Sequence, residues 1–337
     1  MKTPRRRVFP VFIPHLGCPQ QCVFCDQHEI TGCRAPVDPE AVARALSSLP
    51  DRAGLELAFY GGSFTALPAD YQKELLCAAL PAREREAVSF LRLSTRPDAV
   101  SPDELDLLRR FDVRTIELGV QSMDEEVLRL SRRGHSARDT RDAARMVKEY
   151  GFQLILQMMI GLPGSSEDSD LRTAEELIAL GPDGVRIYPA VILRGTELER
   201  QWRQGLYREH TVEDAVRLCA RIVPRFEANA IPVIRLGLNP TEELSGGQAV
   251  GGAYHPALGE LVRSRILRQK AEELLSGVPA GSAVTLGVSP RRISAMTGQH
   301  RCNLDYLQQT FRLSCVKVAA ANTAGEGVVL LASGEKG

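Results

Sequence analysis

Short apolar runs rich in β-branched residues alternate with longer amphipathic stretches over the first two thirds of the chain. The apolar runs predict strands, and the stretches between them predict helices. Because a helix separates each strand from the next, the pattern is typical of β-α units on a parallel sheet. Seven strands are expected, at Val8 to Ile13, Leu55 to Tyr60, Val88 to Ser94, Val113 to Val120, Leu154 to Ile160, Val185 to Tyr188 and Val233 to Leu236.

Two of the predicted helices carry recognisable start signals. Ser101 is followed by Glu104, and Ser122 is followed by Glu125. In such a capping box, the hydroxyl and the carboxylate satisfy amide groups that the first helical turn leaves unpaired. We therefore expect helices to begin at Ser101 and at Ser122.

The composition of the sequence changes near residue 240. A Gly-rich stretch from Ser245 to Pro256 precedes a basic helix, and two short strands follow it near Val284 and Val316. We therefore expect a barrel domain over residues 1–240 and a small α+β extension over residues 241–337.

The C-terminal region is basic in a chain that is neutral overall. Between Leu261 and Val318 there are nine Lys or Arg residues and three acidic residues, whereas the whole chain has 42 of each kind. A basic face fits a polyanion, because binding releases counterions from phosphates. A helix bearing Arg263, Arg265, Arg268 and Lys270 is equally typical of a solvated surface.

Composition excludes several protein classes. The 337 residues are 44% hydrophobic with balanced charge, which is typical of a folded globular protein and not of a disordered chain. The longest apolar stretch, Leu154 to Leu162, contains Gln157 and is far shorter than the roughly 20 residues of a membrane helix. The N-terminus has Pro10 and Pro14 in its only apolar run, unlike a secretion signal. We expect a cytoplasmic protein without a membrane partner.

The eight cysteines fall into two groups. Cys77, Cys219, Cys302 and Cys315 are dispersed among apolar residues, where cysteine usually packs as a small buried hydrophobe. The other four, Cys18, Cys22, Cys25 and Cys33, lie in the first tenth of the chain. The overall density is far below that of a disulfide scaffold, so reduced thiols are expected.

The spacing C-x3-C-x2-C at Cys18, Cys22 and Cys25 follows the first predicted strand directly. Three thiolates are one ligand short of a structural zinc site, which closes a tetrahedron. A four-iron cluster held by only three cysteines keeps one iron open to another ligand. On the triplet alone, a zinc site closed by His28 or Cys33 remains an equal alternative.

Polar and glycine-containing motifs follow the other predicted strands as well. In a β-α barrel, the loops at the carboxyl ends of the strands carry the reactive groups, so these motifs are expected to converge beside the cysteines. They are YGGSFTAL with Gly61, Gly62 and Ser63; LSTRPDAV with Ser94, Thr95 and Arg96; ELGVQSMD with Glu117, Gln121 and Ser122; MMIGLPGSS with Gly161; and VRIYPAVILRGTELE with Arg186, Tyr188 and Arg194.

With these motifs the chain resembles radical S-adenosylmethionine (SAM) enzymes, and among them the radical domain of the Elongator catalytic subunit and its stand-alone bacterial relatives. The resemblance covers roughly residues 5 to 260 and includes LSTRPD, LGVQSMDEEVL, RIYPAVILRGTEL and AYHPALGELV. It implies an α/β fold with a partial (βα) barrel of roughly six strands, so the seventh predicted strand belongs to the barrel edge or to the C-terminal region.

The resemblance also implies a cofactor site. Cys18, Cys22 and Cys25 resemble the ligands of a [4Fe-4S] cluster, and Gly61, Gly62 and Ser63 resemble the motif near the methionyl amine of S-adenosylmethionine. Ser94, Arg96 and Gln121 are the further cofactor contacts that it implies.

The implied activity is reductive cleavage of S-adenosylmethionine and abstraction of hydrogen from a substrate C-H bond. It requires a one-electron reductase such as flavodoxin or ferredoxin as a partner. The Elongator likeness suggests transfer RNA (tRNA) as the substrate. We expect no Elongator acetyltransferase domain after residue 260, because that region is too short for one. The alternatives are a small-molecule or porphyrin-like substrate, or a non-catalytic zinc protein that binds RNA or a nucleotide.

Overall fold

The structure is a computed structural model that describes residues 7–13, 16–18, 21–26, 37–239 and 244–335. The chain divides into two compact units. Unit 1 comprises Met1–Thr211 and Arg225–Tyr254, and unit 2 comprises Val212–Pro224 and His255–Gly337. The domain boundary expected near residue 240 stays a prediction.

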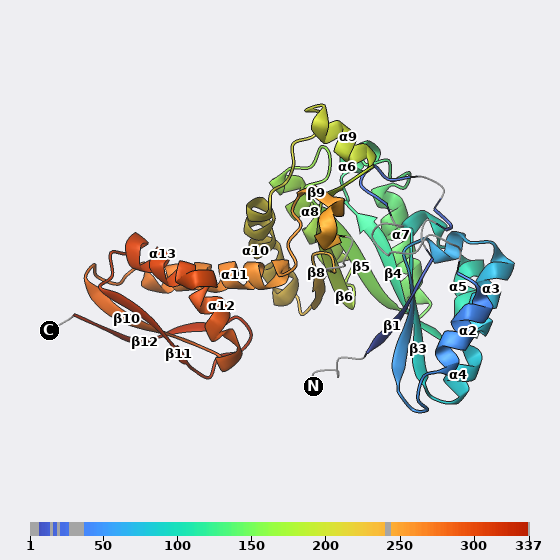
Figure 1. Ribbon diagram of the computed structural model, residues 1–337, viewed down its shortest axis with the longest axis horizontal. Coiled ribbons are helices and arrows are strands. Elements are labelled where there is room, and N and C mark those ends of the chain that lie inside the picture. The colour runs from blue at the N-terminus through green and yellow to red at the C-terminus, as the bar shows by residue number, and fades with distance from the viewer. Residues whose placement is uncertain (1–6, 14–15, 19–20, 27–36, 240–243, 336–337) are drawn as a thin grey trace. The chain divides into compact units, whose positions relative to one another are not determined.

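Unit 1 is built on a seven-stranded sheet in the order β1-β2-β3-β4-β5-β6-β8 (Figure 1). Every neighbouring pair is parallel, so the sheet forms the curled half-barrel of β-α units that the sequence predicts. The seventh strand lies at the sheet edge beside β6, which is one of the two places that the resemblance allows. The strands are β1 (Val8–Phe12), β2 (Leu55–Tyr60), β3 (Val88–Thr95), β4 (Val113–Gln121), β5 (Gln153–Ile160), β6 (Gly184–Pro189) and β8 (Val233–Leu236).

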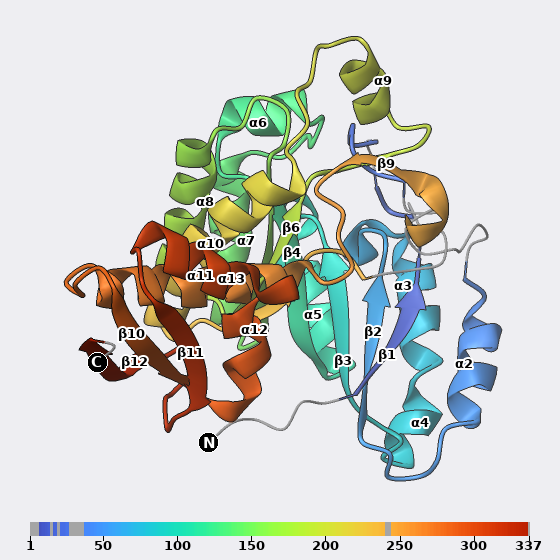
Figure 2. The ribbon, with the colours of Figure 1, turned by 60° about the vertical axis from the view of Figure 1, so that its left-hand side comes forward.

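The two faces of the sheet differ in chemistry, because successive side chains of a strand point to opposite sides. One face is apolar, with Leu57, Leu93 and Ile116 fully buried, and α4, α5, α7 and α8 contact its strands (Figure 2). Burying each such side chain stabilises the fold by about 1.5–3 kcal/mol. The helices of unit 1 are α2 (Pro39–Ser47), α3 (Ala69–Cys77), α4 (Leu80–Glu84), α5 (Pro102–Arg110), α6 (Glu125–Leu130), α7 (Ala137–Glu149), α8 (Glu167–Ala179) and α9 (Glu197–Arg203), while α10 (Val212–Ala228) belongs to both units.

One of the two expected helix starts is confirmed and the other is wrong. Ser101 caps α5, because its side chain accepts a hydrogen bond from the Glu104 amide at 3.3 Å. Helix α6 begins later than expected, at Glu125, and its cap is Asp124, which accepts from two amides of the first turn. Ser122 directly follows the end of β4 and accepts a hydrogen bond from the Asp124 amide at 3.1 Å within that turn.

The Gly-rich stretch contains a strand that the sequence pattern does not reveal. β9 (Ala249–Gly252) pairs antiparallel with β7 (Val191–Leu193) in unit 1. Gly252 has a φ of +77°, and a Cβ there would lie 2.7 Å from the Ala190 carbonyl oxygen. Only glycine fits this approach, which explains why β9 ends in glycine and is too short in apolar residues to be recognised as a strand from its sequence.

Unit 2 has its own small sheet, in the order β11-β10-β12 (Figure 1). β10 (Ser282–Val288) pairs in parallel with β11 (Cys315–Ala320) and antiparallel with β12 (Val328–Glu335). The strands expected near Val284 and Val316 are therefore confirmed, and β12 adds a third. Helices α11 (Leu258–Leu275), α12 (Ile293–Thr297) and α13 (Cys302–Thr310) complete the unit, and their apolar residues share a buried core with the sheet.

The dispersed cysteines are less uniform than expected. Cys219 is buried and Cys315 is half-buried, whereas Cys77 and Cys302 are exposed at the last turn of α3 and the first turn of α13. Burial was therefore the wrong expectation for these two positions, because helix ends reach the surface. Among the described helices, none is long and apolar enough to cross a membrane.

Candidate active site

The loop that carries the cysteines packs tightly on the Gly-Gly turn after β2. The Leu16 carbonyl accepts a hydrogen bond from the Ser63 amide at 3.0 Å. A Cβ at Gly17 would lie 2.2 Å from the Ser63 carbonyl oxygen, and one at Gly62 would lie 2.4 Å from the Leu16 carbonyl oxygen. Since both contacts involve backbone, no side chain fits at either glycine. The two loops are therefore held against each other next to Cys18.

Two of the predicted ligand thiols share a region with two guanidinium groups. Burial and the nearby Cys22 raise the pKa of the Cys18 thiol, while the charges of Arg96 and Arg133 act in the opposite direction. Arg133 Nη1 donates a hydrogen bond to Cys22 Sγ at 3.1 Å. Cations beside a thiol favour its thiolate form, which is the form that binds metals.

Both arginines are buried, at 4% exposure for Arg96 and 7% for Arg133. Arg96 forms two hydrogen bonds with the Asp98 carboxylate, at 2.9 and 2.8 Å. Arg133 donates to the Gly119 carbonyl at 2.6 Å and pairs with no carboxylate in the part of the chain that the structure describes. Arg96 Nη1 and Arg133 Nε lack a hydrogen-bond partner among the described residues. Because burying unpaired charge is costly, this corner of the site favours an anionic ligand.

Hydroxyl groups lock the ends of β2 and β3 together. Ser63 Oγ lies 2.9 Å from Thr95 Oγ1 and accepts a hydrogen bond from the Arg96 amide at 3.2 Å. Thr65 Oγ1 lies 2.6 Å from the same Thr95 oxygen. This fully satisfied network fixes the strand ends beside the cysteines.

The structure brings some of the predicted cofactor contacts together more closely than others. Ser63 and Arg96 are linked to each other, and Gly62 packs on the cysteine loop. Ser94 directly precedes Thr95 on β3, and its hydroxyl donates a hydrogen bond to the Phe59 carbonyl at 3.4 Å. Gln121 ends β4 with a φ of +68° and accepts from the Gln157 amide at 3.3 Å. The roles of Gly61, Gly62, Ser63, Ser94, Arg96 and Gln121 stay predictions.

The polar face of the sheet carries an ion network centred on Glu117, which is 3% exposed. Arg186 approaches Glu117 from β6 at 2.7 Å and Arg92 approaches it from β3 at 3.0 Å. The Tyr60 hydroxyl donates to Glu117 at 2.7 Å. Burial lowers the pKa of Arg186, but Glu117 together with Tyr188 and Tyr60 more than offsets this, so the net shift is upward. The sequence shows the polar positions, but only the strand register shows that they meet.

Two of the histidines, His135 and His255, lie within hydrogen-bond distance of the backbone. His135 is buried, and burial together with the Arg133 charge lowers its pKa to about 4. Its Nε2 lies 3.1 Å from the Val120 carbonyl oxygen, whereas His255 Nδ1 accepts from the Ala257 amide at 3.1 Å. His28 and Cys33, the candidates for closing a zinc site, lie outside the described residues.

Asp170 is an unusual acid that sequence reasoning missed. It is 2% exposed, and burial raises its pKa to about 7. Its Oδ2 accepts from the Gly161 amide at 2.9 Å, so it supports the turn after β5. The only sequence signal is its place in the first turn of α8, where acids are common.

The donor chemistry of the cysteine loop fits an iron-sulfur cluster, because thiolates suit iron and sulfide and the adjacent guanidinium groups offset negative charge. In the part of the chain that the structure describes, however, no three His, Cys, Asp or Glu side chains are gathered into a metal-holding group. The assignment of Cys18, Cys22 and Cys25 as ligands therefore stays a prediction.

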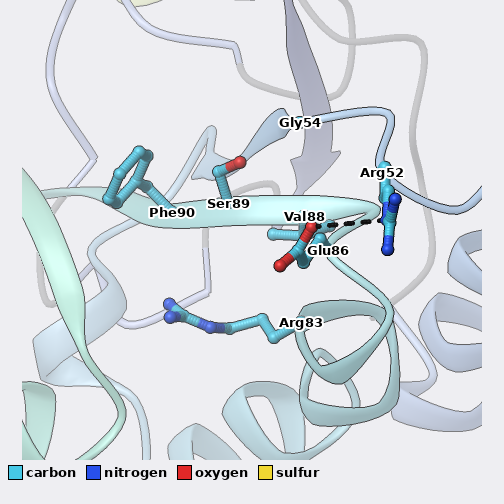
Figure 3. A pocket seen from close by; sticks show the side chains of 7 residues that line it. All are labelled: Arg52, Gly54, Arg83, Glu86, Val88, Ser89 and Phe90. Atoms are coloured by element: carbon cyan, nitrogen blue, oxygen red, sulfur yellow. Dashed lines mark ion pairs between the residues drawn. The ribbon is translucent and has the colours of Figure 1, made fainter.

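A surface pocket lies at the opposite end of the strands. It is lined by residues around the starts of β2 and β3, including Gly54 and Val88, with Arg52 and Glu86 paired at 3.8 Å (Figure 3). The cysteine loop and the Gly-Gly turn follow the carboxyl ends of β1 and β2. The carboxyl ends are where a β-α barrel carries its chemistry, so this pocket is not the candidate site.

Comparison with known proteins places these features in a family. The model of the radical SAM superfamily matches residues 12–177, and that of the Radical_SAM C-terminal domain matches residues 182–268. The tRNA uridine(34) acetyltransferase of Methanocaldococcus infernus is 31% identical over 225 residues, which cover 59% of this chain and 42% of that protein. Human Elongator complex protein 3 is 30% identical over 189 residues, covering 50% of this chain and 35% of that protein. The chain thus spans less than half the length of these two relatives.

Solved structures agree with this result. The archaeal Elp3 of Methanocaldococcus infernus, with its N-terminus deleted, superposes with a TM-score of 0.62 at 25% identity and covers 78% of this chain and 63% of that chain. Coproporphyrinogen III oxidase from Escherichia coli, a radical SAM enzyme, has a TM-score of 0.50 at 20% identity and covers 68% of this chain and 54% of that chain. The second likeness concerns the fold alone.

Proposed function

Because the chain belongs to the radical SAM superfamily of enzymes, we propose that it cleaves S-adenosylmethionine reductively and abstracts hydrogen from a C-H bond of its substrate. Enzymes of this superfamily use a [4Fe-4S] cluster and S-adenosylmethionine, which are the two cofactors that the sequence predicts. When bound, they supply an electron to the sulfonium group and a reactive centre for hydrogen abstraction.

The observation that carries the proposal is the hydrogen bond from the buried Arg133 guanidinium to Cys22, beside the Gly-Gly turn, together with the charges of Arg96 and Arg133 that act on Cys18. In our proposal, the thiolates of Cys18, Cys22 and Cys25 ligate the cluster. Arg96 and Arg133 offset its negative charge, and the bare backbone at Gly61 and Gly62 lets the amino acid part of the cofactor come close. The buried strand ends exclude water around the reacting atoms.

The substrate that we propose is tRNA. The relatives described above carry tRNA uridine(34) acetyltransferase and Elongator names, and their similarity to this chain supports the proposal. The required electron would come from a one-electron reductase of the flavodoxin or ferredoxin class. That partner and a cytoplasmic location stay predictions.

The cluster is tested by anaerobic reconstitution of two cysteine variants. The wild-type protein should become brown, bind about four irons per chain and absorb light at about 400 nm. Cys22→Ala should lose the iron and the absorbance, while Cys77→Ala, an exposed cysteine on α3, should keep both. A colourless protein with one bound zinc would contradict the proposal, as would equal iron loss in the two variants.

The substrate requires a separate experiment. The reconstituted protein is incubated with a chemical reductant, labelled S-adenosylmethionine and bulk tRNA, followed by mass spectrometry of the nucleosides. We expect release of 5′-deoxyadenosine and a new or altered nucleoside. Cofactor cleavage with unchanged nucleosides would refute tRNA as the substrate and leave the radical chemistry intact, as a small-molecule substrate predicts.

A further inference from the structure

Unit 2 contains a pair of helices joined by a tight turn. The chain leaves β10, forms α12 and α13, and returns as β11, which is parallel to β10. The turn comprises residues 298–301, with the sequence G-Q-H-R. Gly298, His300 and Arg301 have φ values of 78°, 49° and 66°. The family models end at residue 268, so this helix pair lies beyond the matched part of the chain.

The basic charge of unit 2 is unevenly neutralised. Arg263, Arg265 and Arg268 of α11 form ion pairs with acids at 3.5, 2.5 and 3.3 Å. The basic helix that the sequence suggests as a polyanion surface is therefore mostly neutralised by its neighbours. Positive charge that remains available for a ligand has to come from another part of the unit.

That charge lies along the helix pair. Between Ser289 and Lys317 the chain has five Lys or Arg residues and a single acid, Asp305. Of the five, Arg292 pairs with Glu326 at 2.7 Å. Arg291 and Arg301 are exposed, as is His300, and none of the three side chains bonds to another described residue. A turn with two basic side chains therefore faces solvent, and a third basic side chain lies at the entry to α12.

A buried amide joins the two helices that flank the turn. Asn303, at 3% exposure, directs its Nδ2 at the carbonyls of Ala295 and Met296, at 3.1 and 3.2 Å, and at Ser264 Oγ, at 2.8 Å. These contacts tie the end of α12 to the start of α13 and to α11. Binding to a turn that is already ordered costs less conformational entropy than binding that has to order the turn.

We propose that unit 2 holds single-stranded RNA through the 298–301 turn, with His300 and Arg301 on the phosphate backbone and Arg291 adding positive charge from the other end of α12. In KH domains, a G-x-x-G turn between two helices grips the backbone of about four nucleotides. Here Arg301 takes the last position of such a turn in a left-handed conformation and adds charge. The choice of RNA rests on the proposed function, and the binding site itself does not.

The test measures binding of the full-length protein to fluorescently labelled RNA. The variant Gln299→Glu/His300→Glu places two acids on exposed turn positions, and Gln309→Glu/Thr310→Glu places two acids at the far end of α13, where both residues are exposed as well. We expect the turn variant to bind single-stranded RNA at least about tenfold more weakly, with a shallower salt dependence. The control should remain within about twofold of the wild type.

The strand preference gives a second readout. A hairpin duplex of the same length should bind more weakly than the single strand, because the turn contacts an unpaired backbone. Equal loss in the two double variants, tighter binding of the duplex, or no RNA binding at low salt would overturn the inference. Thermal melting of both variants confirms that they are folded.

The two proposals fail in different ways. Release of 5′-deoxyadenosine by the turn variant in the absence of RNA should equal that of the wild type, because the turn takes no part in cofactor cleavage. If turn-dependent RNA binding is found without any cofactor cleavage, the proposed function is refuted and the binding site stands. If cofactor cleavage is found and RNA binding does not depend on the turn, the binding site is refuted and the proposed function stands.

Discussion

The Glu117 network allows a quantitative test of how far water is excluded from the polar face of the half-barrel. Glu117→Gln keeps the shape of the side chain and removes its charge. Arg92 then still pairs with Glu56 at 3.2 Å, whereas Arg186 retains no carboxylate partner among the described residues. The Arg186 side chain is 16% exposed, so its charge cannot be fully hydrated in place.

The expected loss follows from the cost of leaving a buried charge unpaired. Removing one partner of a buried ion pair costs about 3–5 kcal/mol. The Gln oxygen still accepts from the Tyr60 hydroxyl, so we expect the lower end, about 3 kcal/mol. For a domain of roughly 200 residues this corresponds to a decrease in Tm of about 6–12 °C.

Differential scanning calorimetry and urea unfolding measure this loss. Glu126→Gln is the matched control, because Glu126 pairs with Arg129 at 2.6 Å on the surface and its removal should leave Tm unchanged. Glu117→Gln/Arg186→Met should recover part of the loss, because it removes the uncompensated charge as well. If Glu117→Gln has the same Tm as Glu126→Gln, the polar face is hydrated and the argument is refuted.

Two further predictions concern the surroundings of the cysteines. Gly62→Ala should impair iron retention after reconstitution and lower Tm, because its Cβ would meet two backbone oxygens at 2.4 Å. The control Gly246→Ala, with open space around it, should behave as wild type. Equal behaviour of the two variants would show that the cysteine loop and the Gly-Gly turn are not packed against each other. His135 has a folded pKa of about 4, below its usual value, so the unfolded chain takes up a proton first and stability falls between about pH 6.5 and pH 4. His135→Gln should remove up to about 3 kcal/mol of that loss, measured as unfolding free energies at the two ends of the range, and an unchanged pH dependence would contradict the assignment.

The strands of unit 1 were predictable because each is a compact apolar run that packs on one side. Side-chain alternation alone shows that Leu57 and Leu93 face the helices. The Glu117 network was not predictable, because Arg186 lies far from Glu117 in sequence and their contact depends on the register across β5. The same holds for β9, where the close approach of the partner backbone dictates Gly252.

Local signals also fail where two residues compete for one role. Ser122 and Asp124 both suit a helix cap, and only the end of β4 at Gln121 decides between them. The charge of α11 gives a similar example. The sequence shows Arg263 and Arg265 as a basic stripe, while their acidic partners come from elsewhere in the chain, at Glu326 and Glu213. Net charge in a window therefore does not identify the surface that remains positive.

The open sheet of unit 1 has two outer strands, and the proline in the first of them has a protective effect. β1 pairs only with β2 among the described strands, and Pro10 lies at its centre. Proline offers no amide hydrogen to an incoming strand, so it discourages self-association through this side of the sheet. At the other side, β8 is only four residues long. The half-barrel can thus keep two open edges without inviting aggregation of its own copies.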